Sequence, residues 1–471
     1  MAIHVAIVGA YGSAGTAVAD ELVEHPDVEL TLIDDGDPGG GLCILRGCMP
    51  SKEVLSAGAH RFQARDDHRT EGTPTVDLDA VVETKERHVT NFAEHRRAAV
   101  HGWADRDDVE LLRDTARFVA PGTLAVGDRR LDPDYVVIAT GSTPFVPDLP
   151  GIEDVDVATS ADVLDATQLP DSGVVMGFGY IGLELVPYLA EAGEMDLTVI
   201  EHDERPLDEA DPAFGDALLD VYREAFDVRV VTEAYEEVVE PLADGGVRLV
   251  VEYGDGTEEA IEADQLYAFT GRNPTLDGLD LDAAGLRPEG DWVADTMQAV
   301  DDEQVFVVGD ANGKEPILHV AKEQGVQAAE NVLAHAAGEP LDPYENVHHH
   351  VVFSGLGVYP YARVGHSEAS AAAAGLDVVA VQRQASDDGV FATKDVPEGL
   401  ASLVVDATDG TVLGYQGLHY HADVMAKTMQ VIVELGLDVR EVPDRSYHPT
   451  TPEILDGLFR DAAAAVGERN R

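Results

Sequence analysis

The sequence predicts an α/β fold of two three-layer domains with parallel sheets, followed by a smaller α+β domain. Two observations predict the parallel sheets: strand–turn–helix units with glycine-rich turns begin near residues 4 and 173, and a further strand–helix pair begins near residue 305. A third observation predicts the last domain, because short strands and one long apolar helix replace this pattern after about residue 346.

The composition is that of a folded chain with an extreme charge. Of the 471 residues, 45% are hydrophobic, which is ample for several cores, and the apolar periodicity argues against disorder. The chain has 90 acidic and 31 basic residues, a formal net charge of −59, which repels nucleic acids and anionic membranes. Such an acidic coat favours a source that accumulates salt, because salt screens its self-repulsion.

The sequence also predicts where the protein works. No apolar run reaches the roughly 18 residues of a transmembrane helix, and the first residues form a predicted strand without a basic segment. We therefore expect a cytoplasmic protein that has neither a membrane nor a nucleic acid as partner. In that compartment disulfides tend to be transient and catalytic.

The first glycine-rich unit has a strand at 4–8, a helix to about residue 24 and a second strand at 28–33. Its residues that match the fingerprint of a dinucleotide-binding βαβ unit are Gly9, Gly12, Gly15 and Asp34. The glycines let the backbone approach a pyrophosphate at the helix N-terminus, and the acid accepts the ribose hydroxyls. Tyr11 is an apparent one-residue insertion in this turn, and Asp35 is the other candidate for the acid.

The second unit has a strand at 173–176, a helix to about residue 192 and a strand at 197–200. Its matching residues are Gly177, Gly179, Gly182 and Glu201. One such motif is weak evidence, but two in one chain, each between a strand and a helix, indicate two bound dinucleotides. Glu201 favours NADH because it repels a 2′-phosphate, whereas His202 and Arg205 favour NADPH, so the choice stays open.

The remaining elements follow from the same periodicities. They are a long charged helix at 79–101, short strands within 109–131, a buried strand and turn at 135–141, a strand at 305–308 and a helix at 319–336. In the last domain they are strands at 378–383 and 403–406 and a long apolar helix at 422–437. Apolar surfaces of this kind often form dimer interfaces.

The only two cysteines, Cys43 and Cys48, lie five positions apart in a glycine-rich turn. So short a disulfide ring removes little entropy from the unfolded chain, so we expect a reversible dithiol that does chemistry. Zinc is a poor alternative, because it prefers four ligands and no second cysteine pair or nearby histidine pair exists. We expect no metal, and we interpret the three histidines at 348–350 as surface or interface residues.

These motifs, in this order, resemble the class I pyridine nucleotide-disulfide oxidoreductases, which include dihydrolipoamide dehydrogenase, glutathione reductase and mercuric reductase. The resemblance spans nearly the whole chain. Beside both glycine units and the cysteine loop at 39–52, it rests on Ala139-Thr140-Gly141, Gly271-Arg272-Asn273-Pro274, Val308-Gly309-Asp310 and His448-Pro449-Thr450-Thr451-Pro452-Glu453.

The resemblance implies two Rossmann-like three-layer domains, one for FAD and one for NAD(P), plus a C-terminal α+β dimerisation domain. The FAD-binding domain would consist of 1–145 and 266–342, the NAD(P)-binding domain of 146–265 and the dimerisation domain of 343–471. The protein would be a homodimer with FAD and NADH or NADPH as cofactors.

The resemblance also implies the path of the electrons. They pass from the nicotinamide to FAD, then to the Cys43–Cys48 disulfide and then to a substrate disulfide, or in reverse. Cys48 would lie nearest the flavin, and Cys43 would attack the substrate as a thiolate. His448, oriented by Glu453, would hold the proton across a two-fold dimer, so that a monomer should be inactive. Taken alone, His448 would be a solvated loop histidine.

Other matching positions would bind the cofactors. Lys52 and Glu184 resemble an ion pair beside the flavin ring, although such charges are more often unrelated surface groups. Asp310 resembles the aspartate on the ribityl chain, and Tyr180 the gate over the nicotinamide pocket. The remaining matched positions are Thr140, Gly141, Gly271, Arg272 and Gly309. The resemblance also implies a cis peptide bond before Pro449. We expect Thr451 to cap the last helix.

Two substrate classes remain, because the chain lacks the extra cysteine pair of mercuric reductases. We favour a charged low-molecular-weight disulfide, because Arg46 lies within the cysteine loop and His60, Arg61 and Arg65 follow it. In salt-loving archaea the abundant thiol is γ-glutamylcysteine, and a reductase of this family acts on its disulfide, bis-γ-glutamylcystine. The alternatives are dihydrolipoamide and, as a different class of protein, a non-catalytic flavoprotein that senses redox state.

Overall fold

The computed structural model describes residues 2–243 and 245–469. These residues form two compact units, which we describe one at a time. The first unit comprises Met1–Pro50, Glu83–Pro144 and Arg272–Asn346, and the second comprises Ser51–Val82, Phe145–Gly271 and Val347–Arg471. The domain boundaries at 145, 265 and 342 stay a prediction.

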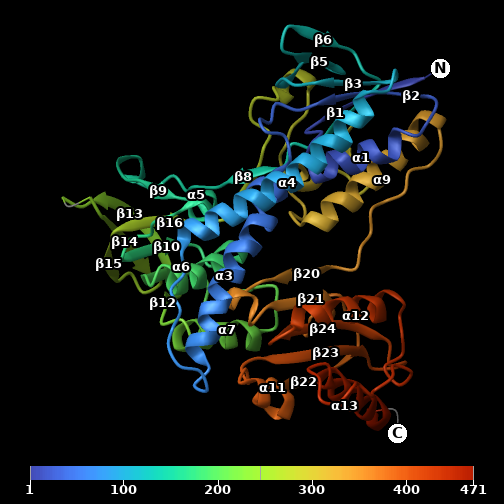
Figure 1. Ribbon diagram of the computed structural model, residues 1–471. Coiled ribbons are helices and arrows are strands. Elements are labelled where there is room, and N and C mark those ends of the chain that lie inside the picture. The colour runs from blue at the N-terminus through green and yellow to red at the C-terminus, as the bar shows by residue number, and fades with distance from the viewer. Residues whose placement is uncertain (1, 244, 470–471) are drawn as a thin grey trace. The chain divides into compact units, whose positions relative to one another are not determined.

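A six-stranded sheet of described residues forms the centre of the first unit (Figure 1). Its order is β18 (Gln298–Ala299), β19 (Asp302–Val307), β7 (Tyr135–Ile138), β1 (Ile3–Val8), β2 (Val28–Ile33) and β3 (Val109–Leu112). All neighbours in this order are parallel except β18 and β19. The two strands of the first glycine unit lie side by side, with Val5 opposite Leu30 and Val8 opposite Ile33.

Alternate residues of β1 pack into two different cores, because successive side chains of a strand point to opposite faces. Val5 and Ile7 pack with the helices of one face, and Ala6 and Val8 pack with a small antiparallel sheet on the other. The helices are α1 (Ser13–Leu22) and α9 (Leu318–Ala337), and the small sheet consists of β4 (Ala116–Ala120), β5 (Thr123–Val126) and β6 (Arg129–Leu131). The first unit therefore has three layers.

A five-stranded parallel sheet in the described part of the second unit repeats this plan. Its order is β12 (Arg229–Val231), β11 (Asp196–Ile200), β10 (Ser172–Met176), β16 (Gln265–Ala268) and β9 (Val157–Ala158). One face packs with α6 (Tyr180–Ala192) and α7 (Pro212–Glu224), and the other with β13 (Ala234–Pro241), β14 (Val247–Tyr253) and β15 (Glu258–Ala263). Both predicted three-layer domains are confirmed, and a sheet forms the third layer of each.

The last part of the chain is the predicted α+β domain. Its antiparallel sheet has the order β20 (His349–Val352), β21 (Tyr361–Gly365), β24 (Val412–Leu418), β23 (Leu400–Asp406) and β22 (Val378–Gln384). The helices are α10 (Glu368–Ala373), α11 (Gly389–Lys394), α12 (Ala422–Glu434) and α13 (Glu453–Arg469). The apolar helix expected at 422–437 ends earlier, because Gly436 takes a left-handed φ of 59° that stops helices.

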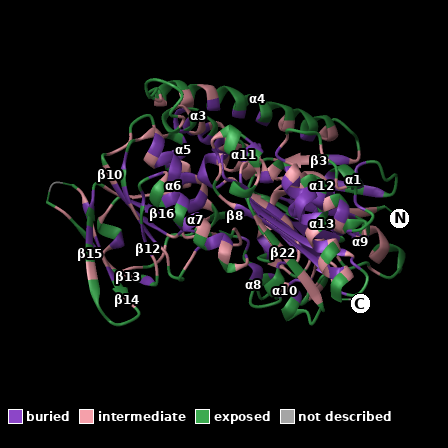
Figure 2. Cartoon of the chain, turned by 90° about the horizontal axis from the view of Figure 1, so that it is seen from below, coloured by how far each residue is buried: buried purple, intermediate pink, exposed green. Residues whose placement is uncertain are grey.

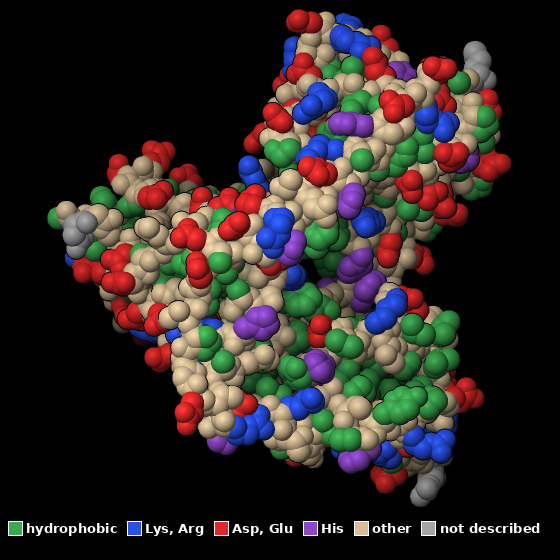
Figure 3. Space-filling model, in the orientation of Figure 1, with side chains coloured by type: hydrophobic (Ala, Val, Ile, Leu, Met, Phe, Trp, Pro, Cys, Tyr) green, Lys and Arg blue, Asp and Glu red, His purple; other side chains and the backbone are tan. Residues whose placement is uncertain are grey.

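The remaining elements connect these layers. They are α2 (Leu42–Leu45), α3 (Cys48–Asp66), α4 (Leu78–Ala104), α5 (Ser160–Asp165), α8 (Leu281–Ala284), and the paired short strands β8 (Ser142–Pro144) and β17 (Arg272–Pro274). Figure 2 shows that α4, the predicted charged helix, is exposed along most of its length. Acidic side chains are spread over the face drawn in Figure 3 rather than gathered in one patch. Within the described residues, no helix is long and apolar enough to cross a membrane.

Arg61 and Arg65 do not form the basic surface that the sequence predicts. Both guanidinium groups bind the Glu191 carboxylate of α6, and Arg61 also binds Glu194 at 2.8 Å. The Arg61 and Glu191 side chains are only 10% and 4% exposed. These cations join α3 to α6 within the second unit, so they are not available to a charged substrate.

Glu191→Ala should lower the free energy of unfolding by about 3–5 kcal/mol, because it leaves the buried Arg61 without its buried partner. The midpoint of urea unfolding measures the loss. The control is Glu194→Ala, which removes an exposed partner of the same arginine and should cost less than about 1 kcal/mol. Equal losses in the two variants would contradict this assignment.

Candidate functional site

Both glycine turns lie at the carboxyl ends of central strands, β1 and β10. Gly9 and Gly177 have left-handed φ values of 95° and 92°. A Cβ on Gly9 would lie 2.3 Å from the Ala139 oxygen, and one on Gly177 would lie 2.8 Å from the Phe269 oxygen. Only glycine fits where each turn passes so close to the end of the neighbouring strand.

The helices that follow these turns begin in a way that suits an anionic ligand. Gly12 and Gly179 are their N-caps, and within the described chain no side chain caps either helix. Three residues further on, a Cβ on Gly15 or Gly182 would lie 2.2 or 2.6 Å from the oxygen of the first glycine. The uncapped N–H groups fit the pyrophosphate of a dinucleotide in both units.

Tyr11 is an insertion, as the sequence predicts, because Gly12 follows Gly9 by three positions whereas Gly179 follows Gly177 by two. Its side chain is buried, and its hydroxyl lies 2.7 Å from Nε2 of His101 on α4. The α1 helix still begins directly after Gly12, so the insertion does not displace its N-terminus.

Two of the three glycines before the cysteines, Gly39 and Gly41, pack against this insertion. A Cβ on Gly39 would lie 2.4 Å from the Tyr11 ring, and one on Gly41 would lie 2.8 Å from the backbone oxygen of Tyr11. Two arginines of α4 donate to backbone oxygens here: Arg96 to that of Tyr11 at 3.0 Å, and Arg97 to that of Gly39 at 2.9 Å. The backbone of the cysteine loop is therefore held against the first glycine turn. No sequence motif predicts a role for either arginine.

The carboxylate of Asp34 faces the first glycine turn. Its Oδ2 accepts the Tyr11 N–H at 2.9 Å and its Oδ1 accepts the Gly36 N–H at 2.9 Å, while Asp35 is exposed. Burial raises the pKa of Asp34 above its usual value. This placement favours Asp34 over Asp35 as the acid of the fingerprint.

At the second turn, carboxylates neutralise the cations that follow Glu201. His202 Nε2 lies 2.6 Å from Glu236 Oε2, and Arg205 Nε lies 2.8 Å from Asp216 Oδ1. The Glu236 side chain is 6% exposed, and its Oε1 has no hydrogen-bond partner among the described residues. No fixed spacing from the motif could have revealed Glu236, which lies on β13.

Cys43 lies on α2, and Cys48 is the first residue of α3. Both cysteines lie in the described part of the chain, and no disulfide bond joins them. The hydrogen bond between the two thiols raises the pKa of Cys43, burial raises it further, and the charge of Arg96 opposes the rise. Cys43 therefore keeps its proton at neutral pH, and its conversion to a thiolate requires a base. Arg46, which lies between the two cysteines in the sequence, is exposed.

Lys52 and Glu184 form an ion pair rather than two unrelated surface charges. Lys52 Nζ lies 2.7 Å from both Glu184 oxygens, and these side chains are 32% and 17% exposed. Phe353, directly after β20, contacts both partners: its ring centroid lies 4.4 Å from Nζ, and its N–H donates to Glu184 Oε1 at 3.1 Å. No sequence motif predicts this role for Phe353.

In the first unit, Ser142 links two of the predicted cofactor residues. Its Oγ donates to Asp310 Oδ2 at 2.5 Å and accepts from Arg272 Nε at 2.9 Å. Burial lowers the pKa of Arg272. Thr140 Oγ1 donates to the Thr275 oxygen at 2.6 Å. The predicted glycines of this unit, Gly141 and Gly309, have positive φ, as does Gly271 at the end of a segment of the second unit.

His448 and Glu453 lie together, as the sequence predicts. Nδ1 of His448 lies 3.1 and 3.2 Å from the Glu453 oxygens, and the His448 side chain is 79% exposed. The hydrogen bond from His448 lowers the pKa of Glu453. The bond before Pro449 is cis, as expected. The expected cap by Thr451 is wrong, because its hydroxyl pairs with His421 Nδ1 at 3.1 Å.

The histidines at 348–350 are not all surface residues. His350 is buried, and its Nε2 lies 3.3 Å from the hydroxyl of Tyr180, the first residue of α6. His348 Nε2 lies 2.8 Å from His350 Nδ1. The interpretation was wrong for His350 because the core of the second unit covers β20, which local sequence does not reveal.

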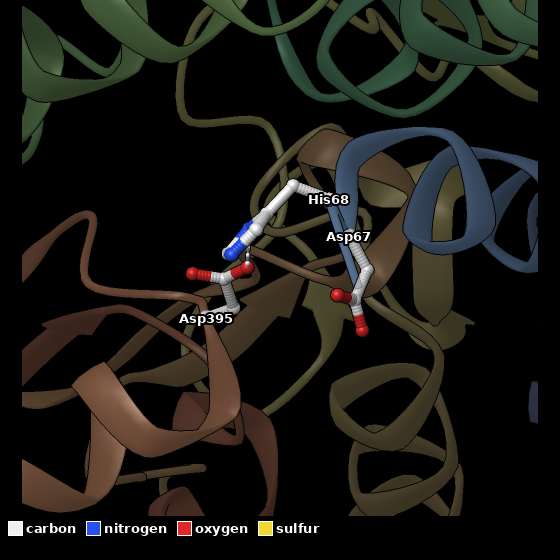
Figure 4. Close-up of side chains that lie close together, drawn as sticks. All are labelled: Asp67, His68 and Asp395. Carbon is white, nitrogen blue, oxygen red and sulfur yellow. Dashed lines mark hydrogen bonds and ion pairs between the residues drawn. The ribbon is translucent and has the colours of Figure 1, made fainter. Parts of the chain in front are cut away.

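One group of described residues has the spacing of metal ligands: Asp67, His68 and Asp395 (Figure 4). Arg69 already binds both Asp67 oxygens, at 2.7 and 2.8 Å, and His68 Nδ1 lies 3.1 Å from Asp395 Oδ2. Because Arg69 occupies both Asp67 oxygens and His68 faces Asp395, we interpret the cluster as a set of side-chain contacts rather than a metal site.

Comparison with known proteins identifies the family. Residues 3–325 match the model of the "Pyridine nucleotide-disulphide oxidoreductase" family, and residues 350–458 match its dimerisation domain. The chain belongs to this family. Family members use FAD and NAD(P)H, and the chain is a flavoprotein disulfide oxidoreductase.

Relatives from several organisms cover nearly the whole chain. Dihydrolipoyl dehydrogenase of Haloferax volcanii is 28% identical over 98% of this chain and 96% of its own length. Mercuric reductase of Shigella flexneri is 30% identical over 97% of this chain and 80% of its own length. The Cu(II) complex of the HOCl-induced flavoprotein disulfide reductase RclA from Escherichia coli has the same fold, with a TM-score of 0.82, 22% identity and coverage of 98% and 99%.

The His202–Glu236 pair predicts a pH effect. The hydrogen bond to Glu236 raises the pKa of His202, so the pair stabilises the fold fully below the unfolded pKa of about 6.5. This contribution is lost as the pH rises through the raised pKa. Histidine NMR should show that His202 titrates above about 6.5, and Glu236→Gln should lower that value. Titration of His202 at or below 6.5 in the unmodified protein would contradict the pairing.

Proposed function

We propose that the protein passes electrons from NADH through FAD and the Cys43–Cys48 pair to a low-molecular-weight disulfide, with bis-γ-glutamylcystine as the favoured substrate. One observation carries this proposal: the loop that holds both cysteines packs, through Gly39 and Gly41, against the glycine turn that fits a dinucleotide. The dithiol and the first cofactor site are thereby parts of one local structure. A salt-rich cytoplasm is the proposed setting, because the net charge of −59 requires screening.

The residues proposed to hold FAD belong to the first glycine turn and to the Asp310 cluster. The uncapped α1 N-terminus would bind the pyrophosphate, Asp34 the ribose and Asp310 the ribityl chain. The chemistry that bound FAD would supply at this site is two-electron transfer between the nicotinamide and the disulfide. Lys52, held by Glu184, would keep a positive charge beside the flavin ring.

Proton transfer is assigned to His448. Because Cys43 keeps its proton at neutral pH, its attack on a substrate sulfur requires a base. Glu453 accepts from Nδ1–H of His448, which leaves Nε2 to take the proton. The highly exposed imidazole suits a base that acts on Cys43 of a second copy.

The homodimer that this base requires is supported by α12. The family's dimerisation domain includes this helix, whose exposed apolar residues are Val424 and Val431, and the exposed Leu435 follows it directly. A second copy would cover these side chains, since exposed apolar patches of this kind mark interaction sites.

NADH is the proposed reductant. Glu201 would repel a 2′-phosphate, and its Oε1 accepts the Asp203 N–H at 3.0 Å, which fixes the carboxylate. His202 and Arg205, the cations that could have bound a 2′-phosphate, are paired with Glu236 and Asp216. The local charge therefore favours an unphosphorylated ribose.

Dihydrolipoamide is the second candidate substrate. The Haloferax volcanii relative is a dihydrolipoyl dehydrogenase, and it covers almost the whole chain. The pairing of Arg61 and Arg65 with Glu191 removes two of the cations that favoured a charged disulfide. Arg46 and His60 remain exposed and support the first candidate.

Anaerobic titration tests the electron path. One equivalent of NADH, but not of NADPH, should reduce the protein and produce a long-wavelength absorption band that reports the Cys48 thiolate beside the flavin. Cys43→Ser should keep its reduction by NADH and lose disulfide reduction, because the attacking thiol is absent. If one equivalent of NADH produces no such band, the protein is a flavoprotein of another kind, such as a redox sensor.

Steady-state rates with bis-γ-glutamylcystine and with lipoamide test the substrate. We expect faster turnover of bis-γ-glutamylcystine, and Arg46→Leu should lower its kcat/KM about fivefold through loss of a charged contact. The rate with lipoamide should not change. The control Arg130→Leu removes an exposed arginine outside the cysteine loop and should affect neither substrate. Faster turnover of lipoamide would overturn the preference.

A further inference from the structure

The hydroxyl of Tyr180 forms hydrogen bonds, whereas part of its ring is accessible to solvent. Tyr180 is the first residue of α6, directly after the second glycine turn, and the residue is 43% exposed. Its hydroxyl donates to Glu209 Oε1 at 3.0 Å and lies 3.3 Å from His350 Nε2. The rings of Tyr180 and His350 lie 5.2 Å apart at an angle of 31°. The tyrosine therefore has one defined orientation.

The hydrogen bonds of this cluster form a consistent chain. Burial lowers the pKa of His350, so its imidazole is neutral and has one donor and one acceptor nitrogen. If His348 Nε2–H donates to His350 Nδ1, at 2.8 Å, then His350 Nε2–H faces Tyr180 and Glu209. The Tyr180 O–H is then left to donate to the Glu209 carboxylate.

Glu209 stays ionised and is itself held in place. Burial would raise its pKa, but hydrogen bonds, first of all with His350, lower it to about 2. Its backbone oxygen accepts from Arg363 Nη1 of β21 at 2.8 Å. Two residues further on, the Asp211 N–H donates to Gln416 of β24 at 3.1 Å. The acceptor of the Tyr180 hydroxyl is thus anchored to the C-terminal sheet.

We propose that Glu209 is a positioning residue for nicotinamide binding, because it holds the ring of Tyr180 in the orientation against which the nicotinamide packs. The proposal rests on the proposed function, in which the second glycine turn binds NADH. A fixed aromatic ring offers a flat apolar face without the entropy cost of ordering a mobile side chain on binding. Neither the glycine motif nor the position of Tyr180 in it identifies Glu209, which lies in the loop between β11 and α7.

Titration calorimetry of NAD⁺ binding to the oxidised protein tests this without turnover. Glu209→Ala and Tyr180→Phe should each raise the Kd of NAD⁺ about three- to tenfold, because each frees the ring. The double variant should be no weaker than the weaker single variant, since both changes remove the same interaction. Glu209→Gln keeps an acceptor oxygen and should stay within about twofold of the unmodified protein.

A matched control exists in the same unit. The Tyr253 hydroxyl donates to Glu259 Oε2 at 2.6 Å, between β14 and β15, so Tyr253→Phe removes a bond of the same chemistry away from the turn. It should leave the Kd of NAD⁺ unchanged. In steady state, Tyr180→Phe should raise the KM for NADH and change kcat by less than twofold, which a general loss of structure would not produce.

The outcomes separate the two proposals. Unchanged NAD⁺ affinity in Tyr180→Phe, or a double variant whose loss is the product of the single losses, overturns the role of Glu209. Tyr180→Phe removes one oxygen atom, so it carries the test even if Glu209→Ala does not fold. If the unmodified protein binds no NAD⁺, the proposed function fails, and this inference fails with it.

Discussion

The rest of the site depends on the close approach of backbone segments at the first glycine turn. Gly9 passes the end of β7, Gly15 packs on the Gly9 backbone oxygen, and two glycines of the cysteine loop, Gly39 and Gly41, pack on the inserted Tyr11. A Cβ at any of these positions would collide with backbone or ring atoms, so the contacts exist only because these residues are glycine. This is why the dithiol and an uncapped helix N-terminus occur in one local structure.

Charge pairing is the second constraint, and it matters because acids outnumber bases almost threefold in this chain. Four basic side chains that the sequence offers to an anionic substrate or a 2′-phosphate have carboxylate partners: Arg61 and Arg65 with Glu191, His202 with Glu236, and Arg205 with Asp216. These pairs change which ligands the protein can prefer. They support the proposal of NADH, and of the basic residues that favour a charged substrate they leave Arg46 and His60 exposed.

Local patterns predicted much of this arrangement. Short motifs, whose geometry depends on near neighbours, predicted both glycine units, the insertion of Tyr11 and the pairing of His448 with Glu453. The change of pattern along the chain predicted the α+β domain. The errors concern long-range contacts. Thr451 contacts His421, thirty residues away. His350 of β20 is buried and contacts Tyr180 of α6, a helix that packs on a different sheet. No local pattern carries that information.

The sequence by itself determined the family, the two dinucleotide turns and the cysteine pair, because these require particular residues at fixed spacing along the chain. Only the tertiary structure decided which charges are neutralised and what surrounds Tyr180. Glu209, Glu236 and Phe353 reach their partners from separate loops and strands, and their residue types have no special spacing relative to the motifs. Hydrogen bonds and ion pairs across such distances depend on packing, which brings together side chains that the sequence keeps far apart.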